Sequence, residues 1–73
     1  MKRGIDMVYE GHQVHLGYST KCQHYRVSLD GVAIGWVVPR LFGAYNNEGE
    51  YLGMFKNIEC AAEAVAEHHV YFS

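Results

Sequence analysis

The stretch that decides the fold is YRVSLDGVAIGWVV, residues 25–38. Asp30-Gly31 at its centre is the dipeptide that a two-residue type I′ turn favours, because both turn positions take positive φ. Such a turn fixes the register of the two strands that flank it. The pairs expected on the apolar side are Leu29 with Val32, Val27 with Ile34, and Tyr25 with Trp36; His24, Arg26 and Ser28 fall on the opposite side. We therefore predict an antiparallel hairpin with one apolar face.

A second stretch, LFGAYNNEGEYLGMFK at residues 41–56, repeats the pattern, since GEYLGMF has the same outline as GVAIGWV. It predicts a turn at residues 47–49, with Gly49 left-handed in a bulge. The pairs expected outward from this turn are Tyr45 with Tyr51, Ala44 with Leu52, Gly43 with Gly53, and Leu41 with Phe55. Pro39 ends the preceding strand and separates the two hairpins. Because a lone hairpin is unstable in water, both hairpins at residues 24–56 are expected in one sheet.

After Lys56 the apolar residues change to a helical period, in NIECAAEAVAEHHVYF. Asn57 is a suitable N-cap, and the pattern predicts a helix over residues 57–70. Its apolar stripe is expected to contain Ile58, Ala61, Ala62, Val65, His69 and Phe72, with Glu59, Glu63 and Glu67 on the outer side. The fold class that follows is α+β, a small antiparallel sheet of two consecutive hairpins packed against one C-terminal helix, in a single domain of residues 1–73.

The first twenty residues leave two alternatives open. MVYEGHQVHLGYS predicts a further hairpin that turns near Glu10-Gly11, because Val14, Leu16 and Tyr18 alternate with His15 and other residues. The same segment would also suit an arm that pairs with a neighbouring subunit.

Composition limits what the chain can be. Seventy-three residues form one small domain, which is marginal as a monomer. Six Tyr, three Phe and one Trp exceed what so small a core hides, which favours an aromatic surface or a homodimer. Two cysteines make no disulfide scaffold, and we expect neither a signal peptide nor a membrane span, so the expected location is the cytoplasm.

Candidate chemical groups are few. His12, His15, Cys22 and His24 fall within thirteen residues, but their spacing matches no standard zinc site. Cys60 lies among glutamates, which disfavour a thiolate nucleophile. The sequence contains no phosphate-binding glycine loop and no nucleophile elbow. We therefore expect no enzyme activity, no cofactor and no bound metal.

The second hairpin is apolar on both faces, whereas one helix covers only one of them. The uncovered face is expected to meet the N-terminal segment, a second subunit or a target macromolecule. Paired glycines at Gly43 and Gly53 would leave a shallow floor beside large aromatic rings. The residues expected to bind a partner are Tyr45, Tyr51, Phe55, Arg26 and His24.

The segment YLGMFKNIECAAEAV, residues 51–65, resembles the strand-to-helix signature of the APETALA2-type DNA-binding domain and of the arm-binding domains of phage integrases. The matching residues are Leu52, Gly53, Phe55, Ala61, Ala62 and Ala64, with Tyr25, Arg26 and Val27 upstream. The resemblance covers about half of the chain. It implies a three-stranded antiparallel sheet on one helix, with the exposed sheet face in the major groove of DNA.

Charge favours a protein partner over nucleic acid. The formal net charge is −2, and Arg26, Arg40 and Lys56 are the only Lys or Arg from residue 26 onward. In size and style the chain also resembles the small accessory proteins of phages and mobile elements, such as anti-CRISPR proteins, which bind and block a host protein. We thus expect a non-catalytic protein that inhibits a host protein by stoichiometric binding, with a nucleic-acid-binding module of the APETALA2 type as the alternative.

Overall fold

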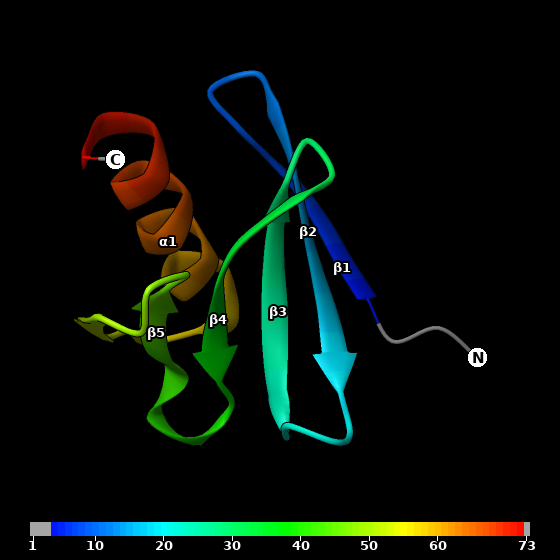
Figure 1. Ribbon diagram of the computed structural model, residues 1–73, viewed down its shortest axis with the longest axis vertical. Helices are drawn as coiled ribbons and strands as arrows, with labels where there is room; N and C mark the ends of the chain where they lie inside the picture. The colour runs from blue at the N-terminus through cyan, green and yellow to red at the C-terminus, as the bar shows by residue number, and fades with distance from the viewer. Residues whose placement is uncertain (1–3, 73) are drawn as a thin grey trace.

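A computed structural model describes residues 4–72, which form six strands, one short 3-10 helix and one α-helix (Figure 1). The strands are β1 (Gly4–Tyr9), β2 (His12–Ser19), β3 (His24–Leu29), β4 (Val32–Val38), β5 (Gly43–Asn46) and β6 (Tyr51–Met54). The 3-10 helix η1 is Arg40–Phe42, and the helix α1 is Ile58–Phe72.

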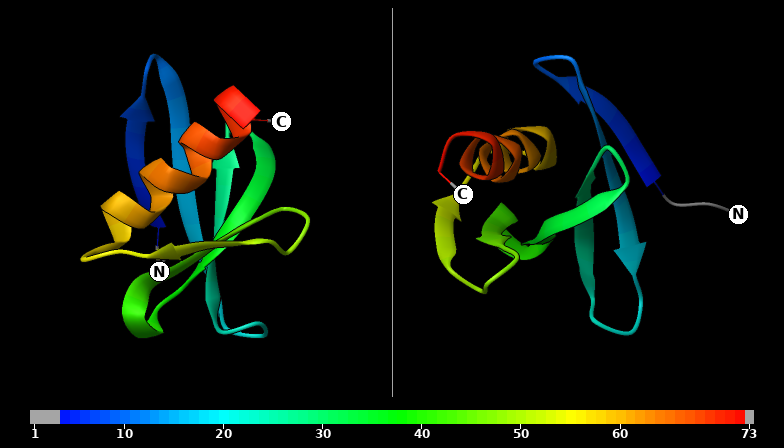
Figure 2. Two further views of the ribbon diagram at one scale, coloured as in Figure 1. Left: turned by 90° about the vertical axis from the view of Figure 1, so that its left-hand side faces the viewer. Right: turned by 45° about the horizontal axis from the view of Figure 1, so that its top comes forward.

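The strands form one sheet in the order in which they occur along the chain, each antiparallel to the next. Helix α1 packs on one face of this sheet, mainly over β4 and β5 (Figure 2). We call the opposite side of the sheet the outer face. The predicted α+β class is confirmed, and the sheet gains a third hairpin from β1 and β2.

Three hairpin turns use left-handed backbone at the expected positions. Of the two alternatives for the N-terminal segment, the hairpin is the one observed, and it turns with Glu10 at φ 48° and Gly11 at φ 86°. The predicted type I′ turn is confirmed by φ values of 50° at Asp30 and 87° at Gly31. Gly49 is also left-handed, at φ 88°. These turns place three hairpin tips at one end of the sheet.

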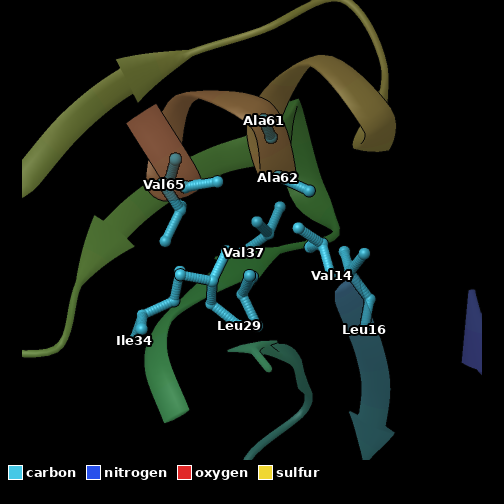
Figure 3. Close-up of a cluster of buried hydrophobic side chains, with 11 residues drawn as sticks. Val14, Leu16, Leu29, Ile34, Val37, Ala61, Ala62 and Val65 are labelled. Atoms are coloured by element: carbon cyan, nitrogen blue, oxygen red, sulfur yellow. The ribbon is translucent and has the colours of Figure 1, made fainter. Parts of the chain in front are cut away.

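The core lies between α1 and the inner face of the sheet (Figure 3). Alanines on the helix let it approach the strands closely, and Val65 packs against β4. Buried hydrophobic residues of the core are Val14, Leu16, Val27, Leu29, Ile34, Val37, Ala44, Ala61, Ala62, Val65 and Ala66.

Helix α1 begins where the sequence predicts. The Cys60 amide donates a hydrogen bond of 2.8 Å to Asn57 Oδ1, which confirms Asn57 as the N-cap. The helix continues two residues beyond the expected end at residue 70. The predicted apolar stripe is wrong at Phe72, which is 73% exposed.

The register of the first predicted hairpin is wrong beyond its first two pairs. Leu29 faces Val32 and Ser28 faces Ala33 as expected, but Val27 then faces Gly35. Ile34 is therefore a β-bulge, and its buried side chain joins the core. Because one extra residue reverses which face later side chains take, Trp36 lies on the outer face, opposite Arg26 and not opposite Tyr25.

A second bulge changes the other predicted hairpin. Tyr45 faces Tyr51 as expected, but Ala44 faces Gly53 because Leu52 is unpaired. Gly43 then faces Met54 instead of Gly53. The expected pair of Leu41 with Phe55 is absent from the described sheet, since Leu41 lies in η1 with φ 63°.

Candidate functional site

Four aromatic side chains from four adjacent strands form a row on the outer face. They are His24 on β3, Trp36 on β4, Tyr45 on β5 and Tyr51 on β6, and we call this row the aromatic ladder. Neighbouring ring centroids are 5.6, 5.5 and 5.4 Å apart along the row. These distances lie within the range of favourable aromatic pairs.

Strand register explains why the rings meet. Trp36 faces Tyr45, and Tyr45 faces Tyr51, across adjacent strands. His24 lies diagonally from Trp36, since Arg26 directly faces Trp36. The ladder therefore depends on the bulge at Ile34, without which Trp36 would point toward the helix.

The Trp36 ring has an offset-stacked neighbour on each side in the ladder. The planes of His24 and Trp36 differ by 18°, and those of Trp36 and Tyr45 by 14°, so both pairs are stacked. His24 and Tyr45 stand on opposite sides of Trp36 because β3 and β5 flank β4. At the end of the ladder, the Tyr51 ring is tilted by 55° from that of Tyr45, and its residue is 55% exposed.

A shallow depression of about 160 Å³ continues the ladder at one end. Its floor is Gly43, where a methyl group would lie 3.6 Å from Tyr51 Cε1 and 3.9 Å from Tyr45 Cε1. The residues that line the depression are Val38, Arg40, Leu41, Gly43, Tyr45, Tyr51 and Met54. The expected floor therefore exists at Gly43, but Gly53 pairs with Ala44 and takes no part in it.

The electrostatics of this surface are set by two arginines. Arg26 is exposed opposite Trp36, and Arg40 lines the depression. Burial, and then the positive charge of Arg26, lower the pKa of His24 below its usual 6.5. At neutral pH His24 is therefore an uncharged stacking partner. The acidic residues of α1 lie in the other layer of the fold.

The structure brings together four of the five side chains that the sequence predicts for the site. His24, Arg26, Tyr45 and Tyr51 share the outer face. Phe55 does not, because it packs against the core beside Leu52 and α1. Trp36 is the member that sequence reasoning missed. Its signal was Gly35, since a glycine within a strand is a mark of a bulge or a close backbone contact.

Other chemically active residues form simpler contacts. His12 Nδ1 lies 2.7 Å from Asp30 Oδ2, and His15 Nδ1 lies 2.7 Å from Asp6 Oδ1. Within residues 4–72, no group of three His, Cys, Asp or Glu side chains is arranged to hold a metal ion. Nor is any helix in this part of the chain long and apolar enough to cross a membrane.

Comparison with known proteins adds no relative to this description. The chain matches no protein-family model, no curated protein and no solved structure.

Proposed function

We propose that this protein acts by stoichiometric binding of a partner protein, which docks on the outer face over the aromatic ladder and the Gly43 depression. The stacking of the ladder is the observation that carries the proposal. Tyr51, Met54 and Leu41 are 55%, 61% and 66% exposed, so the ladder lies within a wider apolar surface. Aromatic and arginine side chains are the residue types that contribute most to protein–protein affinity.

The order of the ladder favours such binding energetically. Side chains that are already stacked lose little rotamer freedom when a partner covers them, and that loss is a main cost of association. Cross-strand contacts hold Trp36 and Tyr45 in place before any partner arrives. The surface is therefore preorganised.

The same geometry disfavours a nucleic acid. Proteins that bind single strands stack each base on the open surface of an aromatic ring. Trp36 already has a stacked neighbour on either side, and His24 adds no positive charge at neutral pH. Phosphate binding also needs many cations, whereas the chain has a formal net charge of −2 and the ladder is flanked by two arginines, Arg26 and Arg40.

A narrower hypothesis concerns the partner. The size and style of the chain support a host protein as the target, bound and inhibited in the manner of small phage accessory proteins such as anti-CRISPR proteins. In this hypothesis one copy of the chain occupies one target molecule, and no reaction is catalysed.

The decisive experiment first captures the partner protein and then compares the binding of two matched variants. The tagged chain is used to capture proteins from its native host, and each candidate is purified and titrated by calorimetry. Tyr51→Ala is expected to weaken binding at least tenfold, because removing an aromatic ring from the centre of an interface costs about 2 kcal/mol or more. Tyr71→Ala is the control, since Tyr71 is 57% exposed, on α1.

A second variant tests the depression. Gly43→Ala adds only a methyl group to the floor and should weaken binding without loss of fold. Equal effects of Tyr51→Ala and Tyr71→Ala would contradict the proposed surface. Sub-micromolar retention of DNA at physiological salt, abolished by Arg26→Ala, would instead support the nucleic-acid alternative.

A further inference from the structure

The sheet has two edge strands, and they differ in how well they are protected. At β6 the edge is four residues long, is interrupted by the bulge at Leu52, and contains Gly53 at φ 126°. At β1 the edge is six residues long and pairs with β2 without a register shift. Short or bulged edges resist further pairing, whereas a regular edge invites it.

The free hydrogen-bonding groups of β1 can be assigned from its neighbour. Gln13 faces Val8, and both backbone groups of Gln13 point the other way, toward β3. Its amide donates to Asp30 Oδ1, and its carbonyl accepts from the Asp30 amide. Val8 therefore exchanges no hydrogen bonds with β2. By the alternation of antiparallel pairing, Val8, Asp6 and Gly4 direct their backbone groups to the open edge.

The side chains of β1 fit a second β1. Ile5, Met7 and Tyr9 form a half-buried row on the helix side, against the core. Helix α1 lies mainly over β4 and β5, toward the opposite edge of the sheet, and its last turn reaches the β1–β2 turn, where the Tyr71 hydroxyl donates a hydrogen bond to Glu10 (Figure 2). On the outer face, Val8 is 59% exposed beside Asp6. This strand carries no proline and no bulge in residues 4–9 that would block pairing.

We infer that this edge is the contact of a symmetric homodimer, in which β1 of two copies pair antiparallel about a two-fold axis at Met7. In this register Asp6 faces Val8 of the second copy, and their outward backbone groups exchange hydrogen bonds. On the helix side Ile5 faces Tyr9 of the second copy, an apolar pair that favours strand association.

Charge selects this register over its neighbour. A shift that centres the axis on Asp6 would place two carboxylates directly opposite each other, which is destabilising. With the axis at Met7, each Asp6 meets an apolar side chain. The dimer leaves the aromatic ladder free, since the ladder belongs to β3 through β6.

The test is sedimentation equilibrium of the full chain from low micromolar to millimolar concentration. Because Val8 faces Asp6 of the second copy twice in each dimer, Val8→Asp should raise the dissociation constant about tenfold. Val8→Lys should lower it by a similar factor. Gln13→Asp and Gln13→Lys, one strand inward on the same face, are the controls and should change it little.

Amide exchange gives an independent readout, in which the Val8 amide should slow as concentration rises. A chain that stays monomeric at millimolar concentration would overturn the inference, as would equal effects of the two Val8 variants. The dimer should also persist in Tyr51→Ala, so this result and the result for the proposed function can fail separately.

Discussion

Gly35 is the position where the structure predicts the largest effect from the smallest change. A methyl group at Gly35 would lie 2.3 Å from the Tyr45 carbonyl oxygen and 2.8 Å from Val65 Cγ1. The first contact is with backbone, so strand β4 or β5 would have to move by about 1 Å to reach normal packing distance. Overpacking of this kind costs about 3 kcal/mol.

For Gly35→Ala this loss is a large part of the roughly 4–11 kcal/mol expected for the unfolding of a domain of this size. The corresponding fall in Tm is about 12–24 °C. Thermal unfolding followed by circular dichroism measures it directly.

Gly43→Ala is the matched control, one strand away on the opposite face. Its added methyl group meets nothing closer than 3.6 Å, and its φ of −72° and ψ of 129° suit any residue. We expect no loss, or a gain of up to about 1 kcal/mol from the lower entropy of the unfolded chain. If the two variants unfold at the same temperature, the close packing of α1 and β5 on Gly35 is refuted.

Three further predictions concern single side chains. Asn57→Ala should lower the free energy of unfolding by about 1 kcal/mol in urea denaturation, whereas Asn57→Ser should retain most of it. Hydrogen bonds from His12 and the Gln13 amide lower the pKa of Asp30 below 3.8. The stability they add is therefore present above pH 3.8 and is lost as pH falls through the folded pKa. Asp30→Asn should remove this loss when the free energy of unfolding is measured against pH in the acid range. The lowered pKa of His24 also makes the protein less stable as pH falls, because below pH 6.5 the unfolded chain binds the proton before the folded chain does. His24→Phe should remove this loss of stability, which Tm measured between pH 7 and 5 would show.

Local signals in the sequence predict much of the fold. The Asp30-Gly31 turn, the left-handed Gly49 and the Asn57 cap each depend on a few adjacent residues, and all three are confirmed. Such features follow from backbone conformation and short-range hydrogen bonds, which a short stretch of chain determines by itself.

The two bulges could not be predicted in this way, and they decide the candidate site. Whether Ile34 pairs or bulges depends on the fit of its side chain into the core and on the approach of α1 to Gly35. Those contacts involve residues far away in sequence. Each bulge reverses the side of the sheet to which the following side chains point. Trp36 therefore lies on the outer face, and Phe55 is not among the residues of the site.

The order of the strands has a consequence for how the chain reaches this structure. Every strand pairs with its neighbour in sequence, so the sheet contains mostly local contacts, and local contacts favour rapid folding. Helix α1, by contrast, is synthesised after all six strands, and its 15 residues supply the cover of the inner face. A growing chain therefore displays the apolar sides of β2, β3 and β4 to the surrounding solution until α1 emerges. Transiently exposed apolar surface of this kind makes an incomplete chain prone to aggregate.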